Sequence, residues 1–136
     1  MNITEYIVND FNPLTTQSTV KEALKLCKEH TITHIPVADN GFYVGCISQT
    51  DVFTIENKEE LLKESLDIFD HFQMNNNESL LELLTIFADN DANIIPVVVN
   101  QKYLGYIDLN DVLDVFSQTP FLNSEGFILV IEKNTK

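Results

Sequence analysis

A serine and an aspartate stand three residues apart in the stretch GCISQTD, residues 45–51, where a strand-like segment runs into a helix-like one. Ser48 and Asp51 can cap that helix: the hydroxyl accepts a backbone N–H, and the carboxylate stabilises the first turn through the helix dipole. The same pair can bind a ligand. A hydroxyl at a helix start donates to a phosphate oxygen, and a carboxylate accepts both hydroxyls of a ribose. The spacing leaves both interpretations open.

Other arrangements that could do chemistry fail on their context. His30 and His34 have the spacing of metal ligands on a helix, but Pro36 predicts a strand at His34, so we expect no metal site. The run DNDAN begins like a calcium loop, yet Ile94 and Asn100 stand where Gly and Glu are needed. The sequence contains no nucleophile elbow, phosphate-binding loop or paired Cys–His arrangement. We therefore expect no enzymatic activity.

The charge of the chain limits its partners. The 136 residues carry a net charge of −13, with 21 acidic residues and no arginine. Nucleic acids and anionic membranes require a basic surface, so we expect neither as a partner, and the acidity can simply keep the surface soluble. With no long apolar run and no basic leader, the chain is expected to be cytoplasmic. Cys27 and Cys46 are expected to be free, buried thiols.

An internal repeat indicates how these residues are positioned. Residues 60 apart match without gaps, including two Ile-Pro-Val segments at 35–37 and 95–97. Gly45 and Asp51 then fall on Gly105 and Asp111. Two prolines, two glycines and two aspartates in one register indicate a duplication. Neither unit of roughly 45 residues could bury much core alone, so we expect the two to pack together.

Each copy reads as a β-α-β-β-α unit, which predicts an α/β (α+β) fold. Thr19 and Ser79 are expected to cap the first helices, and the segments ending near residues 57 and 117 to form the second ones. The expected elements, given for the first and second copy, are a short strand at 14–15 and 74–75, a helix at 20–30 and 80–90, a strand around Pro36 and Pro96, a turn at 39–41 and 100–102, a strand at 42–47 and 103–107, and a helix at 49–57 and 109–117. A helical connector is expected at 57–72, with 3–8 as its N-terminal counterpart.

The second copy differs at one position of the motif. It reads GYIDLND, residues 105–111, so Asp108 replaces Ser48 while Asp111 matches Asp51. Aspartate is a good N-cap, and the capping role is kept. A carboxylate beside a phosphate is repulsive, so we expect no phosphate binding in the second copy. An uncharged or cationic adenosyl group could still fit there.

The doubled pattern resembles a tandem pair of CBS domains, a Bateman module. The resemblance covers about residues 1–117 and implies two repeats packed with pseudo-two-fold symmetry, dimerisation through their helices, and a regulatory role. It also implies an adenosyl ligand between the repeats, with Ser48 near the phosphate and Asp51, or Asp111 in the second copy, on the ribose. Backbone and apolar groups of 31–35 and 91–95 would hold the base. The expected contacts of the first copy are thus Leu14, Thr15, Thr16, Thr33, His34 and Ile35. The isoleucines can equally be core residues.

Residues 118–136 fall outside the duplication. Residues 126–132 read as a buried strand, which resembles the first strand of an ACT-like domain and would make the chain a fragment. Alternatively, the strand pairs with a dimer mate or a sheet edge. The predicted boundaries are therefore 1–57 for the first repeat with an N-terminal helix, 58–117 for a linker helix and the second repeat, and 118–136 for an extension.

Two functions remain open. The first is a homodimeric sensor of an adenosyl ligand, with AMP, adenosine or S-adenosylmethionine preferred over ATP because the chain is acidic and lacks arginine. The second is a dimerising scaffold that has lost ligand binding. Asp108 and the missing basic residues favour the scaffold, whereas the intact motif of the first copy favours the sensor.

Overall fold

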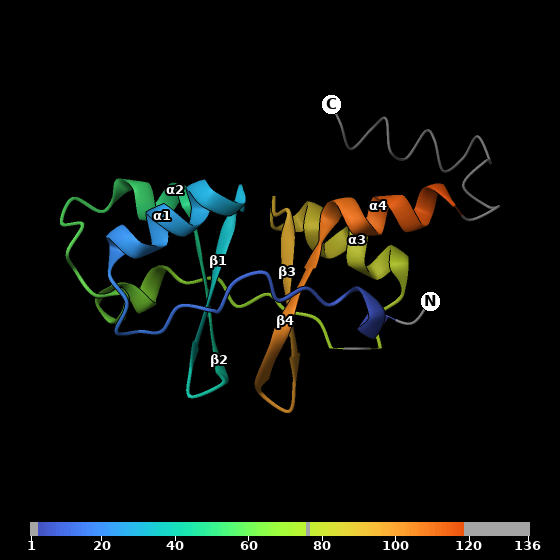
Figure 1. Cartoon of the computed structure of the whole chain (residues 1–136), viewed down its shortest axis with the longest axis horizontal. Coiled ribbons are helices and arrows are strands. Elements are labelled where there is room, and N and C mark those ends of the chain that lie inside the picture. Colours follow the sequence, from blue (N-terminus) through green and yellow to red (C-terminus); the bar gives the residue numbers. More distant parts are fainter. Residues whose placement is uncertain (1–2, 76, 119–136) are drawn as a thin grey trace.

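The computed structural model describes residues 3–75 and 77–118 and has a mixed α+β fold (Figure 1). One antiparallel sheet has the strand order β1-β2-β4-β3. The helices of both copies lie on one side of the molecule, and the two β-hairpins point the other way (Figure 1). The elements are η1 (Ile3–Tyr6), α1 (Val20–His30), β1 (His34–Asp39), β2 (Phe42–Ser48), α2 (Gln49–Thr54), η2 (Leu62–Ile68), α3 (Leu80–Asp89), β3 (Ile94–Val99), β4 (Lys102–Asp108) and α4 (Leu109–Ser117).

Rare backbone conformations recur at positions 60 residues apart and confirm the duplication. Thr31 and Asp91, 60 residues apart, both have a left-handed conformation with φ of 53° and 50°. Gly45 and Gly105 have φ of 151° and 147°. The β1–β2 and β3–β4 ladders each shift register by a bulge, at Val37/Ala38 and Val97/Val98. Rare conformations that recur in one register show that the two copies share their backbone geometry.

The predicted helix starts are confirmed. Thr19 caps α1 and Ser79 caps α3, each by accepting the backbone N–H of a glutamate three residues later. Glu22 and Glu82 reach back to the cap residue and complete a capping box in both copies. Both helices therefore begin where their local sequence directs them.

The second helices differ in length because one paired position differs. Helix α4 continues to Ser117, and Phe116 in its last turn is only 1% exposed. The corresponding residue of the first copy is Glu56, which has no apolar group to bury. Helix α2 ends at Thr54 rather than at 57 as predicted, and Lys58 donates hydrogen bonds to carbonyls at its end. Burial of one phenylalanine thus accounts for the longer helix in the second copy.

The hairpins are as predicted, but the expected first strands are reduced. Asn40 and Gly41 in one hairpin, and Asn100 and Gln101 in the other, all have positive φ, as tight two-residue turns require. The residue pairs expected as first strands form only single parallel bridges, Leu14 with Val37 and Met74 with Val97.

The connector is helical, as predicted, but over a shorter range than 57–72. It forms a 3-10 helix, η2, with a non-helical residue at Ser65, and not an α-helix; its N-terminal counterpart η1 is also a 3-10 helix. Beyond η2, Asp70 exchanges two backbone hydrogen bonds with Cys46 of β2 (2.8 and 2.7 Å). Val8 makes the same exchange with Tyr106 of β4 (2.8 and 3.1 Å). Each copy therefore begins on a segment that pairs with the strand of the other copy.

The glycine of the repeated motif makes room for this pairing. A Cβ at Gly45 would lie 2.9 Å from the Asp70 carbonyl oxygen, and one at Gly105 would lie 2.7 Å from that of Val8. Both glycines also have a φ that residues with side chains rarely adopt. The glycine of the Gly-x-Ile-x-x-x-Asp pattern therefore serves the crossing of the chain.

The two copies share a core, as expected. Ile94 and Tyr106 of the second copy belong to the buried cluster of the first copy. At the hairpin end, Phe42 of β2 pairs with Lys102 of β4. At the other end, Thr33 and Asn93 exchange hydrogen bonds from backbone N–H to side chain, 2.9 Å each. The predicted strand at 126–132 lies outside the described residues.

Candidate functional site

Ser48 is the N-cap of α2, which confirms its structural role. Its Oγ accepts the Asp51 backbone N–H at 3.1 Å. Helix α2 has only 6 residues, so its dipole adds little to ligand binding. The Ser48 hydroxyl still has its own hydrogen to donate, because capping uses only a lone pair. A ligand role for Ser48 therefore remains a prediction that is compatible with its cap.

Asp51 lies half-buried near His34. Its carboxylate makes no hydrogen bond or ion pair with any side chain among residues 3–75 and 77–118. The pKa of His34 is lowered from 6.5, chiefly by burial, and the carboxylates of Asp70, Asp91 and Asp51 partly oppose this. Three carboxylates thus act electrostatically on one buried imidazole, which is mostly neutral at pH 7. We call Ser48, Asp51, His34 and Asp70 the first site.

His34 joins the connector to the sheet. The residue is 5% exposed, and its Nε2 lies 3.6 Å from Asp70 Oδ2. Its Nδ1 is 2.8 Å from Thr33 Oγ1, and its ring meets the Phe72 ring edge-on at 5.0 Å. His34 starts a strand, as predicted. Its ring is therefore held by contacts from its own copy and from the start of the next.

A cavity of about 310 Å³ lies beside the first site. Thr33, Gln49 and the cationic Lys28 are among the residues that line it, whereas none of the four residues of the first site does. The Gln49 backbone N–H donates to the Thr33 carbonyl (2.8 Å), so the segment before β1 and the start of α2 are fixed to each other. The volume is at the lower end of the range for small-molecule sites.

The structure brings together only part of the predicted contact set. Thr33 and His34 lie next to Ser48, since His34 pairs with Ser48 in the sheet. Ile35 is fully buried in the core cluster, so its side chain is a core residue, the alternative given for the isoleucines above.

The remaining predicted contacts, Leu14, Thr15 and Thr16, form a segment that runs beside β1 from its middle to its far end. Leu14 bridges Val37, and Thr16 bonds to the Asp39 carboxylate through its N–H (2.9 Å) and its hydroxyl (2.7 Å). Asp39 ends a strand that starts at His34, which separates Thr16 from Ser48 by roughly 16 Å. The structure thus places Thr16 away from the first site, while a ligand role for Leu14 and Thr15 stays a prediction.

The segment that does reach the first site is 70–72, which sequence reasoning missed. Asp70 pairs with Cys46, and the Phe72 carbonyl accepts a hydrogen bond from the Tyr43 hydroxyl (2.9 Å). The sequence contains one signal for it: Asp10 and Asp70 stand in the same register of the repeat. That register identifies equivalent residues, but it does not reveal that each one crosses to the other copy.

The equivalent second site is more acidic. Asp108 caps α4 by accepting the Asn110 backbone N–H at 2.8 Å. Burial raises the pKa of Asp111, and the carboxylates of Asp108, Asp114 and Asp10 raise it further. We call Asp108, Asp111, Tyr106 and Phe11 the second site, where a phosphate would be repelled.

Aromatic side chains fill the second site. The Phe11 ring stacks on Tyr106 at 5.0 Å and lies 4.7 Å from the ring of His30. Phe11 is 9% exposed and Tyr106 is 4% exposed. In the first copy the equivalent positions are His71, which is exposed, and the small Cys46. The first site has its own rings, His34 and Phe72, but lacks the stacked pair of Phe11 and Tyr106 that occupies the second.

The described residues offer little for catalysis or metal binding. Both cysteines are free and buried, as predicted, and burial raises the pKa of Cys27 to about 11 and that of Cys46 to about 12. Both thiols are thus protonated at neutral pH and weakly nucleophilic. Within residues 3–75 and 77–118, no group of three or more His, Cys, Asp or Glu side chains could hold a metal ion. No helix in the same part of the chain is both long and apolar enough to span a bilayer.

Comparison with known proteins shows similarity to parts of longer chains. The uncharacterized protein MJ1232 of Methanocaldococcus jannaschii is 32% identical over 101 residues, which is 73% of this chain and 34% of that protein. Inosine-5'-monophosphate dehydrogenase of the same organism is 30% identical over 113 residues, 80% of this chain and 22% of the enzyme. The chain therefore spans about a third or less of the length of these two relatives.

Solved structures share the fold. A CBS domain pair/ACT domain protein from Thermotoga maritima matches with a TM-score of 0.74 and 18% identity, over 87% of this chain and 98% of that one. CBSX2 in complex with AMP matches with a TM-score of 0.66 and 18% identity, over 86% of this chain and 96% of that one. The CBS domain model matches residues 3–57 and 74–118. The chain belongs to the CBS domain family, as a tandem pair of these regulatory modules.

Proposed function

We propose that the chain senses an adenosyl ligand at the first site, with no catalytic role of its own. The half-buried Asp51 carboxylate carries this proposal, because it has no partner among the described residues and can accept the hydroxyls of a ribose. The Ser48 hydroxyl and the cavity at Thr33 lie in the same region. The fold shared with AMP-bound CBSX2 supports the ligand class.

The charge around the site selects among adenosyl ligands. Asp51, Asp70 and Asp91 all act on His34, and the chain has no arginine to offset them. A triphosphate is therefore disfavoured relative to AMP or adenosine, and the cationic sulfonium of S-adenosylmethionine suits the site. Binding between the copies would change their relative angle, which a partner domain or protein would sense.

The protein is further proposed to be a cytoplasmic homodimer that associates through its helices. Several large apolar side chains on them are exposed, among them Phe53 (74%), Leu81 (61%) and Leu113 (39%). The alternative function is a dimerising scaffold without a ligand. The filled and acidic second site supports that alternative for half of the module.

Thermal melting tests the proposal. The native chain and Asp51→Ala are melted with AMP, ATP and S-adenosylmethionine, alongside size-exclusion chromatography. A ligand at about 100 times its Kd stabilises the native state by about 2.7 kcal/mol, and we expect this for AMP or S-adenosylmethionine before ATP. Asp51→Ala should abolish the shift. A dimer whose melting responds to no adenosyl ligand would support the scaffold instead. A shift unchanged in Asp51→Ala would refute the assigned site.

A further inference from the structure

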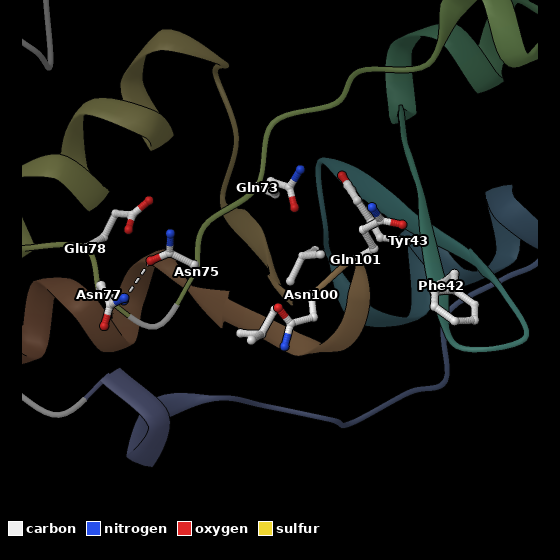
Figure 2. Close-up of a pocket in the computed structure, with 10 residues that line it drawn as sticks. Phe42, Tyr43, Gln73, Asn75, Asn77, Glu78, Asn100 and Gln101 are labelled. Atoms are coloured by element: carbon white, nitrogen blue, oxygen red, sulfur yellow. Dashed lines mark hydrogen bonds between the residues drawn. The ribbon is translucent and has the colours of Figure 1, made fainter.

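A second cavity, of about 640 Å³, lies at the hairpin end of the sheet (Figure 2). The start of β2, residues 73, 75, 77 and 78, and the β3–β4 hairpin surround it. Phe42, which lines it, pairs with Asp39, whereas Ser48 is at the other end of the same strand. The cavity is thus separated from the first site by the length of β2.

One paired position differs between the two copies at this end of the sheet. In the first copy, the Asp39 carboxylate bonds twice to Thr16 and ties the loop before α1 to the β1–β2 hairpin. The residue equivalent to Asp39 is Val99, which cannot accept a hydrogen bond. Both loops carry the same short bond, from the Gln17 N–H to Thr15 Oγ1 (3.1 Å) in the first copy and from the Asn77 N–H to Asn75 Oδ1 (2.8 Å) in the second. The cavity lies between this loop and Val99.

The lining is rich in carboxamides and has no cationic side chain. Five amide side chains face the cavity from both walls, and Glu78 adds one carboxylate: the amides are Gln73, Asn75, Asn77, Asn100 and Gln101 (Figure 2). Each carboxamide can both donate and accept hydrogen bonds. An anionic ligand would meet a carboxylate and a chain of net charge −13, with no counter-charge in the lining. Hydroxyl groups, which also donate and accept, match this lining.

The cavity also has an apolar side. The Phe42 ring is 48% exposed and stands at one end of the cavity (Figure 2). The side chains of Val98 and Val99 contribute further apolar surface. An aromatic face is electron-rich and attracts the polarised C–H groups of a sugar ring, while carboxamides satisfy its hydroxyls. Few ligand classes combine an apolar face with many uncharged hydroxyls.

We propose that this cavity binds an uncharged, hydroxyl-rich small molecule of the saccharide class. Gln73 and Gln101 lie on opposing segments and bond to ring hydroxyls, and Glu78 accepts hydrogen bonds from a neighbouring pair of hydroxyls. Phe42 packs against the C–H face of the ring. The site is separate from the adenosyl site, so the two can be occupied together.

NMR titration tests the proposal directly. The ¹⁵N-labelled chain is titrated with glucose, with maltose and, for comparison, with adenosine, while backbone and side-chain amide signals are followed. A saccharide should give saturable shifts at 73–78, at 98–101 and in the carboxamide signals of Gln73 and Gln101. The signals of Ser48 and Asp51 should stay in place. Shifts of Ser48 and Asp51 without shifts at the hairpin end, or no saturable shift with either sugar, would overturn the proposal.

Matched variants locate the site. Gln73→Ala and Phe42→Ala should each weaken saccharide binding by about fivefold, since each removes one favourable contact from solvent-exposed positions that leave the fold intact. Gln17→Ala is the control, because Gln17 is the first-copy equivalent of Asn77 and its loop is tied to Asp39 through Thr16. It should bind like the native chain. Equal weakening in Gln17→Ala, or unchanged binding in both test variants, would contradict the assignment.

Discussion

The first and second sites occupy equivalent places in two copies that share their backbone, yet they differ in what fills them. The second site buries Phe11 against Tyr106 and His30, whereas the first has the exposed His71 and the small Cys46 at the paired positions. Ser48 in the first site corresponds to Asp108 in the second. A duplicated fold can thus keep its backbone while it places different side chains at equivalent positions.

The largest difference in stability between the copies should come from truncating Phe11 and its first-copy equivalent, His71. Phe11→Ala should lower the free energy of unfolding by about 3 kcal/mol, because it empties a buried aromatic stack. His71→Ala, its equivalent in the first copy, should change stability by less than about 0.5 kcal/mol, since His71 is exposed. Urea unfolding of both variants measures this. Similar losses in the two variants would show that the first site is filled as well.

The next largest loss of stability should come from substitution of the glycines at the crossing segments. Here the two copies should lose similar amounts. Gly105→Ala and Gly45→Ala should each cost about 2 kcal/mol, because an L side chain is strained at φ near 150° and meets a carbonyl oxygen. Gly105→Ala should cost more, since its Cβ would approach Val8 O at 2.7 Å against 2.9 Å for Asp70 O. Gly41→Ala, with nothing within 4 Å, separates dihedral strain from the clash. A loss in Gly41→Ala as large as in Gly105→Ala would rule out the clash as the cause.

The smallest expected effect concerns His34, whose equivalent is Ile94. The folded pKa of His34 is lowered below 6.5, so the unfolded chain takes up a proton that the folded chain resists. Stability should therefore fall as pH falls below about 6.5, by at most about 1.4 kcal/mol per pH unit. His34→Ile removes this contribution, and urea unfolding at pH 7 and pH 5.5 should show a weaker pH dependence. An unchanged pH dependence would mean that His34 protonates freely in the folded chain.

The fold was predictable where local sequence determines it. Each local signal acts within a few residues: the caps Thr19 and Ser79, the turn at Asn40, and the prolines of β1 and β3. The register of the repeat then allowed each element predicted in one copy to be predicted in the other. The length of α2 was overestimated because it depends on a distant property, the burial of Phe116 in one copy and not of Glu56 in the other.

The site was only partly predictable. Ser48, Asp51, Thr33 and His34 come together because they are close in the sequence or paired across one hairpin. The crossing of 70–72 to β2 depends on tertiary packing between copies, and no local pattern encodes it. The bond of Thr16 to Asp39 joins residues 23 positions apart, and no local pattern encodes it either.

The central claim is that only the first site binds an adenosyl ligand, and the stoichiometry of AMP binding tests it most directly. Isothermal titration calorimetry of the native chain should give one AMP per chain. Asp51→Ala should weaken binding by tenfold or more, about 1.4 kcal/mol, and Asp111→Ala should leave it unchanged. Two AMP molecules per chain, or binding that depends on Asp111 rather than Asp51, would contradict the account.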